Sequence, residues 1–167
     1  MLYLILAAAL VGLDQLVKFL VRTNIPLGEG VPFLPHILQL TYVQNTGAAF
    51  SLFARHTWIL SLVSLAASVL LVVLLVKKVF PHPFARFCLA LVLAGAVGNL
   101  IDRVLLGYVT DMFQTLFMNF AVFNVADICI VCGGIAFCAY YLLGLKRKMN
   151  MSQLLTHTEG CFSSIAN

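Results

Sequence analysis

Four long apolar stretches alternate with shorter polar segments along the chain, at residues 2–21, 57–76, 87–106 and 125–145. Each is close to the roughly 20 residues that an α-helix needs to cross a bilayer, and residues 57–76 carry no charge. The third stretch is rich in small residues between Ala90 and Gly98, which let neighbouring helices approach closely. The pattern predicts an all-α membrane protein built as a bundle of four transmembrane helices.

The segment between the first two spans breaks this apolar pattern. It contains several helix-breaking residues, namely Pro26, Gly28, Gly30, Pro32 and Pro35. Residues Ile37–Val43 are then rich in β-branched and aromatic side chains, and an Asn45–Gly47 turn precedes a second candidate strand at 48–53. Residues Tyr108–Phe113 alternate weakly and form a further candidate strand. We therefore expect a small β-sheet that lies against the membrane.

The composition is that of one compact membrane domain. Of the 167 residues 62% are hydrophobic and only 10% are charged, and the mean hydropathy is +1.04. A soluble core of this size cannot bury so much apolar surface. We expect the domain to cover residues 1–148 and to be followed by a polar, disordered tail at 149–167. The net charge of +4 does not indicate a nucleic-acid partner, because the basic residues cluster at span ends without interleaved aromatic residues.

The distribution of basic residues predicts the orientation of the bundle. Lys77, Lys78 and Arg86 lie between the second and third spans, and three basic residues at 146–148 follow the fourth. The positive-inside rule places these loops and both termini in the cytoplasm. No basic region precedes Asp14, so we interpret residues 2–21 as a retained helix rather than a cleaved signal peptide. The sheet is then extracytoplasmic, and five acidic residues fall at or near the outer face: Asp14, Glu29, Asp102, Asp111 and Asp127.

Polar residues within the first and third spans are candidate functional residues, since ionised groups at membrane depth are costly and usually serve a function. Asp14 and Lys18 are four residues apart and share a helix face. They form either a self-neutralising pair near the membrane boundary or a pair that faces the bundle and supports a site. Asn99, Asp102 and Arg103 share a face of the third span. Asp102 beside Arg103 is typical of charge pairing that orients neighbouring groups.

Asp111 and Asp127 form the strongest candidate site, because they flank the turn between the third and fourth spans at the same membrane level. Asn124 with an acid three residues later also resembles a capping box, which alone would explain Asp127. Two close carboxylates cannot both ionise cheaply, so one keeps a proton while the other activates water. The pair therefore indicates an aspartic peptidase dyad. The Asn45–Gly47 turn is a candidate for binding the substrate backbone above it.

Other chemistries fit the sequence less well. The chain has no HExxH or GxSxG motif, and its four histidines lie in loops and the tail. Cys129 and Cys132 have no second ligand pair at metal-binding spacing, so we expect no metal or other cofactor. A small transporter or proton-conducting subunit would use the same acids as a relay, but a relay distributes them through the membrane depth, whereas these gather at one end. In a structural assembly protein, Asn99 and Asn124 would instead hold helices together.

Read in order, these residues resemble bacterial lipoprotein signal peptidase (signal peptidase II). The resemblance extends from Asp14 to about Leu145 and rests on five motifs: Asp14-Gln15…Lys18, Asn45-Thr46-Gly47-Ala48-Ala49-Phe50, Gly98-Asn99-Leu100-Ile101-Asp102-Arg103, Val109-Thr110-Asp111 and Phe123-Asn124-Val125-Ala126-Asp127. It implies a metal-independent intramembrane aspartic endopeptidase of the bacterial plasma (inner) membrane. Such an enzyme removes the signal peptide of diacylglyceryl-modified prolipoproteins before the lipidated cysteine, and globomycin inhibits it.

The resemblance also implies roles for individual residues. Asp111 and Asp127 fall on the catalytic positions. Substrate-binding or supporting positions fall on Asp14, Lys18, Asn45, Gly47, Asn99, Asp102, Arg103 and Asn124. We expect a monomer embedded in membrane lipid. Two features depart from the family pattern: Thr110 stands where an aliphatic residue is usual, and the tail at 149–167 has no counterpart.

Overall fold

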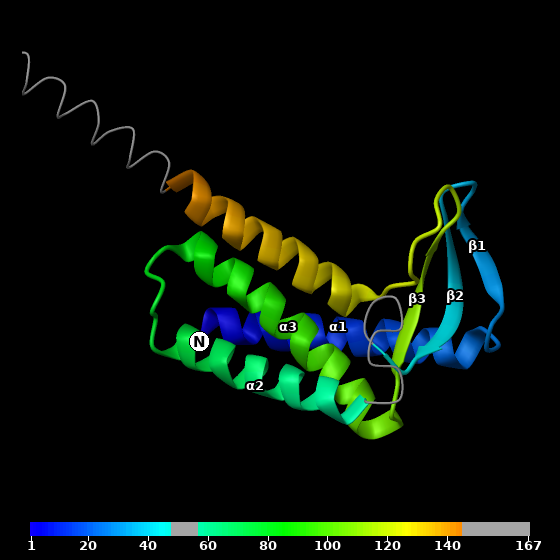
Figure 1. Ribbon diagram of the computed structural model, residues 1–167, viewed down its shortest axis with the longest axis horizontal. Helices are drawn as coiled ribbons and strands as arrows, with labels where there is room; N and C mark the ends of the chain where they lie inside the picture. The colour runs from blue at the N-terminus through cyan, green and yellow to red at the C-terminus, as the bar shows by residue number, and fades with distance from the viewer. Residues whose placement is uncertain (48–56, 145–167) are drawn as a thin grey trace, which may run out of the picture.

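The computed structural model describes residues 1–47 and 57–144 of the chain. Within them, four helices are long and apolar enough to cross a membrane, and three strands form one small sheet (Figure 1). The helices are α1 (Leu2–Asn24), α2 (Thr57–Val76), α3 (Pro83–Leu106) and a C-terminal helix (Val125–Gly144). The strands are β1 (Gly30–Leu34), β2 (Leu38–Asn45) and β3 (Val109–Thr115). The predicted fold class is confirmed.

The sheet is antiparallel in the order β1-β2-β3 and stands at one end of the helix bundle (Figure 1). β2 and β3 correspond to the strands predicted at 37–43 and 108–113. The sequence did not predict β1, which contains Pro32. A proline is tolerated there because β1 is an edge strand, where a missing N–H breaks no ladder. The strand predicted at 48–53 lies outside the described residues.

α3 is the central helix of the bundle, between α2 and the C-terminal helix (Figure 1). In its most apolar 18 residues 56% are buried, against 17–22% for the other three helices. The apolar core joins α1, α2 and α3 through seven buried residues: Ala7, Leu71, Leu75, Leu89, Ala90, Leu93 and Ala94. Large apolar side chains cover the outside of the helices, as expected where lipid replaces water as the solvent. α3 is therefore the scaffold on which the polar residues are arranged.

Glycines allow α3 and the C-terminal helix to pack closely. A Cβ atom on Gly95 would overlap the backbone carbonyl oxygen of Ala126 and lie 2.6 Å from Cγ1 of Ile130. In the opposite direction, a Cβ on Gly133 would lie 2.8 Å from the carbonyl oxygen of Cys88. Such contacts are closer than real Cβ atoms make. The small residues of the third span thus bring its polar end against the first turn of the C-terminal helix.

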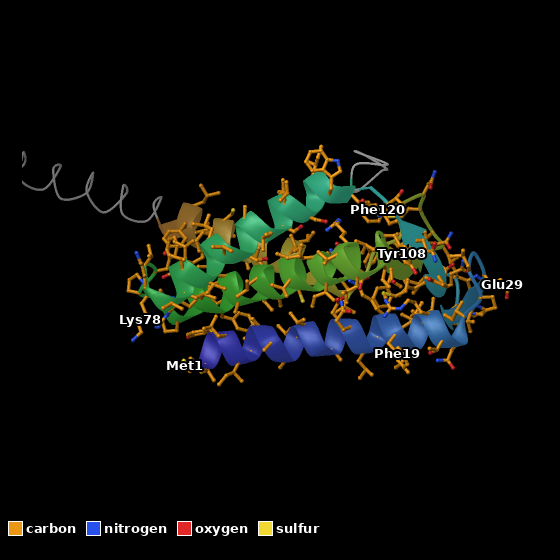
Figure 2. All side chains as sticks on the ribbon, turned by 90° about the horizontal axis from the view of Figure 1, so that it is seen from below. Met1, Phe19, Glu29, Lys78, Tyr108 and Phe120 are labelled. Atoms are coloured by element: carbon orange, nitrogen blue, oxygen red, sulfur yellow. The ribbon has the colours of Figure 1, made fainter. Side chains whose placement is uncertain are left out.

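Polar segments close the bundle at both ends. Figure 2 shows Met1 and Lys78 at one end, and Glu29, Tyr108 and Phe120 at the other. α1 and α3 are longer than the apolar spans predicted for them, because each continues into polar or capping residues. α3 begins with Pro83, and Nδ1 of its N-cap His82 accepts a hydrogen bond from a backbone amide. At its other end α3 stops at the left-handed C-cap Gly107, and β3 begins two residues later at Val109.

Candidate active site

Asp111 is buried in the sheet, at the point where β3 passes the end of the bundle. Its side chain is 2% exposed. Both of its oxygens accept hydrogen bonds from asparagine amides. Asn45 Nδ2, at the end of the neighbouring strand β2, donates to Oδ2 at 2.9 Å, and Asn124 Nδ2 donates to Oδ1 at 2.6 Å. The pairing of β2 with β3 thus brings Asn45 to Asp111 from across the sheet.

Asp127 lies in the first turn of the C-terminal helix. The amide of Asn124 donates to Asp127 Oδ2 at 3.2 Å, and the amide of Asp127 donates to Asn124 Oδ1 at 2.9 Å. This reciprocal pair is the capping box that the sequence suggested. Both residues also form hydrogen bonds outside this cap. Asp127 Oδ1 also accepts from Asn99 Nδ2 on α3 at 2.8 Å, while Asn124 reaches Asp111.

Two asparagines connect the carboxylates. Asn124 Nδ2 donates to Asn99 Oδ1 at 3.2 Å as well as to Asp111, and Asn99 in turn donates to Asp127. These hydrogen bonds link Asp111 on β3 to Asn124 at the start of the C-terminal helix, then to Asn99 on α3. From Asn99 they return to Asp127 on the C-terminal helix. Asp111 and Asp127 line the same cavity of about 370 Å³. Asn124 therefore forms hydrogen bonds with both acids.

The cavity combines a small polar floor with a larger apolar wall. Its polar lining consists of Asn45, Gly47, Asn99, Arg103, Asp111 and Asp127. The wall includes Ile128, Ile130 and Val131 of the C-terminal helix, and Phe120 and Phe123 from the segment before it. Few polar groups converging in an apolar pocket are typical of a ligand or active site. Neither phenylalanine was predicted to line a site, because nothing in the pattern marks a loop phenylalanine as cavity-lining.

The surroundings of Asp111 raise the pKa of its carboxyl to about 6, from the ordinary value of 3.8. Burial is the largest cause, because removal from water penalises the charged form. The negative charge of Asp127 acts in the same direction, whereas the hydrogen bonds from Asn45 and Asn124 and the charge of Lys18 lower the pKa. Asp111 therefore holds a proton at a pH where an ordinary aspartate is ionised.

Behind the cavity lies a buried cluster of charges. Lys18 Nζ contacts Asp14 Oδ2 at 3.0 Å and Asp102 Oδ2 at 3.4 Å, and all three side chains are at most 2% exposed. The pair formed by Asp14 and Lys18 thus faces the bundle, which was one of the two arrangements considered. Lys18 also donates to Asn99 Oδ1 at 2.9 Å. The cluster therefore touches the cavity through Asn99 without lining it.

Asp102 does not pair with Arg103, and this part of the sequence interpretation was wrong. Successive helical residues point about 100° apart and cannot face each other. Asp102 pairs instead with Lys18 and, at 3.7 Å, with Arg22. Arg103 points toward the cavity and the α2 side, where its Nη1 contacts Ser64 Oγ at 3.5 Å.

One of the expected acids lies away from the site, and two polar residues make contacts that were not predicted. Glu29 lies at the sheet end but is exposed (Figure 2), so four of the five acids expected at the outer face gather and the fifth does not. Sequence reasoning missed the contacts of Gln15 and Arg22. Gln15 Nε2 donates to the Gly98 carbonyl at 3.0 Å, and Arg22 Nη1 donates to Thr110 Oγ1 at 3.0 Å. A sequence signal for Gln15 was present, since a polar residue inside an apolar stretch is unusual.

Across residues 1–47 and 57–144, no three potential metal ligands gather.

Comparison with known proteins identifies the family. The model of the signal peptidase (SPase) II family matches residues 6–143. The chain is 46% identical over 144 residues to the lipoprotein signal peptidase of Enterococcus faecalis (strain ATCC 700802 / V583), covering 86% of this chain and 89% of the relative. It is 43% identical over 143 residues to the lipoprotein signal peptidase of Clostridioides difficile (strain 630), covering 85% and 95%.

Solved structures share the architecture. A bacterial membrane enzyme determined by the in meso method at 2.3 Å resolution superposes with a TM-score of 0.82 at 29% identity, over 87% of this chain and 90% of the other. A second, at 1.9 Å resolution, gives a TM-score of 0.76 at 30% identity, over 84% and 92%. The chain therefore belongs to the signal peptidase II family and is a membrane peptidase that removes signal peptides from prolipoproteins.

Proposed function

We propose that this peptidase is an aspartic endopeptidase with Asp111 and Asp127 as its catalytic dyad. It cleaves diacylglyceryl-modified prolipoproteins immediately before the lipidated cysteine. The observation that carries the proposal is the shared cavity, into which two carboxylates from different elements project and between which Asn99 and Asn124 form hydrogen bonds. Carboxylates that share a site in this way divide the acid and base roles between them.

Asp127 is the base and Asp111 the acid. Asp127 accepts two N–H donors and lies at a helix N-terminus, a setting that favours a negative charge. It takes a proton from water, whose oxygen attacks the scissile carbonyl carbon. Asp111, with its raised pKa, donates its proton to the carbonyl oxygen, and a proton on the dyad then passes to the leaving amine.

Arg103 is the cation nearest to this chemistry in the cavity lining. Its Nε is buried and has no hydrogen-bond partner within residues 1–47 and 57–144. A substrate carbonyl oxygen placed beside it would supply the missing acceptor. The guanidinium also offsets part of the negative charge of the dyad. We assign Arg103 and Asn45 to substrate binding, and Gly47 to the backbone that borders the same space.

The apolar wall explains how a membrane-embedded substrate is held. Ile128, Ile130 and Val131 continue from Asp127 along the C-terminal helix, and Ile128 and Val131 are also exposed on the bundle surface. A signal helix arriving sideways through the bilayer packs against this wall, and its cleavage site stops at the polar floor. A cyclic peptide such as globomycin occupies the same space. One chain supplies all of these groups, so the peptidase acts as a monomer.

The sheet end is the outer face of the bacterial plasma (inner) membrane. Lys77 and Lys78 are exposed at the other end of the bundle, where the positive-inside rule favours the cytoplasm. At the sheet end, by contrast, Arg22 is held in an ion pair with Asp102. This orientation puts both termini in the cytoplasm and the dyad near the outer interface, where water reaches it.

Purified peptidase in detergent micelles tests the proposal. We expect it to cut a diacylglyceryl-modified prolipoprotein, releasing a product whose first residue is the lipidated cysteine, as read by mass spectrometry. The same precursor without the lipid serves as the control and is cut far more slowly. A metal chelator leaves the rate unchanged, because the two carboxylates perform both proton transfers. Equal cleavage of the unmodified precursor, or loss of activity on chelation, contradicts the proposal.

The pH profile reports the proton on Asp111. Activity requires this proton, so kcat/KM falls as the pH rises through the pKa of the free enzyme. Asn45 lowers that pKa by donating to the ionised form. Removing the donor in Asn45→Ala raises the pKa, and the basic limb of the profile moves to higher pH. The maximal rate falls as well, since Asn45 lines the cavity.

Gln44→Ala is the matched control for this shift. Gln44 is the preceding residue of β2, and its amide donates to the hydroxyl of Tyr42 at 2.9 Å rather than to Asp111. The basic limb of this variant stays where it is in the wild type. A limb that moves to lower pH in Asn45→Ala, or equally in both variants, is inconsistent with Asp111 as the proton donor.

A further inference from the structure

Two buried carboxylates outside the cavity each bind the backbone just before a dyad residue. Asp14 Oδ1 accepts a hydrogen bond of 2.9 Å from the amide of Ala126, which precedes Asp127. Asp102 Oδ2 accepts one of 2.9 Å from the amide of Thr110, which precedes Asp111. Asp14 lies on α1 and Asp102 on α3. Each catalytic strand or helix is thus attached, one residue away from its aspartate, to a different carboxylate.

Lys18 joins these two carboxylates. Its Nζ lies 3.0 Å from Asp14 and 3.4 Å from Asp102, and its side chain is fully buried. We name Asp14, Lys18 and Asp102 the Lys18 cluster. It has room because residue 98 is glycine: a Cβ there would lie 2.6 Å from Asp14 Oδ2. The result is a continuous path of polar contacts from the Ala126 amide through Lys18 to the Thr110 amide.

We propose that the Lys18 cluster sets the distance between Asp111 and Asp127, with Lys18 as a positioning residue. This inference rests on the proposed dyad. None of the three side chains lines the cavity, so the cluster acts through the backbone rather than on the substrate. Hydrogen bonds from amides to carboxylates that carry charge are stronger than neutral ones, and the ammonium of Lys18 contacts both carboxylates.

Lys18 has a second contact that acts in the same direction. It donates to Asn99 Oδ1 at 2.9 Å, which leaves Nδ2 of that amide to donate to Asp127. Loss of the ammonium removes this orienting bond and the ion pairs of Lys18 with Asp14 and Asp102. Arg22, 3.7 Å from Asp102, is then left to balance two buried carboxylates that repel each other. Such repulsion moves the C-terminal helix and β3 relative to each other. A displacement of about 1 Å at reacting groups costs about a hundredfold in rate.

Lys18→Met tests the cluster, because methionine keeps most of the volume and removes the charge. We expect kcat on the lipid-modified prolipoprotein to fall about a hundredfold, while KM changes by less than about threefold. Lys77→Met, an exposed lysine at the other end of the bundle, is the control. An unchanged kcat contradicts the inference. So does a loss confined to KM, because Lys18 would then bind substrate.

Restoring the charge balance should restore turnover. In Lys18→Met/Asp14→Asn the surplus carboxylate is removed, yet an oxygen remains for the amide of Ala126. We expect kcat to recover by at least about tenfold relative to Lys18→Met, since one factor of ten is about 1.4 kcal/mol in the barrier. A lysine that merely stabilised the fold would not give rescue of kcat at constant KM. No recovery in the double variant contradicts the inference.

A pair of single variants decides the matter if Lys18→Met does not fold. Asp14→Asn keeps the oxygen that accepts from Ala126, whereas Asp14→Leu removes it. We expect kcat of Asp14→Asn to exceed that of Asp14→Leu by at least about tenfold, at similar KM. Equal kcat values overturn the inference. They would leave the proposed dyad intact, since that depends on Asp111→Asn and Asp127→Asn in an otherwise unchanged protein.

Discussion

Asp111→Asn and Asp127→Asn are each expected to lower kcat by at least about a hundredfold, the lower end of what one general acid or base contributes. Asparagine has nearly the shape of aspartate but neither releases nor accepts a proton in this range of pH. The losses arise from opposite roles. Asp111→Asn removes the proton donor, and Asp127→Asn removes the group that activates water. A gel-shift assay of precursor and product measures both.

Asp102→Asn is the matched control for the dyad variants. Asp102 is buried like the two dyad residues, but it lies behind the cavity. The asparagine that replaces it keeps an oxygen that can accept from the backbone amide of Thr110. We expect a partial loss of activity in this variant. Thermal unfolding in detergent shows whether each protein is folded. Near-wild-type turnover in either dyad variant, or an equal loss in all three, rules out the assignment of Asp111 and Asp127.

Gly95→Ala is expected to have the second-largest effect, although Gly95 contacts no substrate. Its Cβ would collide with the carbonyl oxygen of Ala126, a backbone atom one residue from Asp127. Backbone cannot move aside as the end of a side chain can, so the C-terminal helix must shift away from α3. Overpacking of this kind costs about 1–3 kcal/mol of stability. The shift also separates Asp127 from Asn99, and we expect about a hundredfold loss in kcat/KM.

Gly134→Ala provides the comparison, because a Cβ added there meets nothing within 4 Å. Alanine in place of glycine in a helix stabilises it by up to about 1 kcal/mol, so this variant should unfold at the same or a slightly higher temperature. Its activity should equal that of the wild type. Similar melting temperatures and activities for the two variants would show that close packing at Gly95 does not position Asp127.

That Asp111 and Asp127 line one cavity could be anticipated from the sequence, because the membrane fixes the length of each span. A helix that begins near Phe87 and rises 1.5 Å per residue ends close to the far side of the bilayer. Asp111 follows the end of one span and Asp127 lies in the first turn of the next, so the two residues are expected at the same level. The capping box at Asn124 was equally readable, since it depends on residues three apart.

The partners of individual charges could not be predicted in this way. The bond from Asp14 to the amide of Ala126 joins residues 112 apart in the chain, and no local pattern encodes it. It depends on the rotation of α1 against α3, which is set by packing around Gly98. Asp102 was matched with Arg103 because they are adjacent in sequence, whereas helical geometry directs them to different neighbours. β1 was missed because Pro32 argues against a strand. Its position at the edge of the sheet makes the proline acceptable, and no local pattern shows that position.

The most direct test of a coupled dyad is to observe its proton. The chain contains only four aspartates, Asp14, Asp102, Asp111 and Asp127, so carbon-13 labelling of aspartate carboxyls gives a simple NMR spectrum. Single Asp→Asn variants assign its signals. We predict that the Asp111 signal titrates with a pKa of about 6. In Asp127→Asn the negative charge that raises this pKa is gone, so the midpoint moves to lower pH. An Asp111 signal that titrates near the ordinary 3.8, and does not respond to Asp127→Asn, would contradict the account.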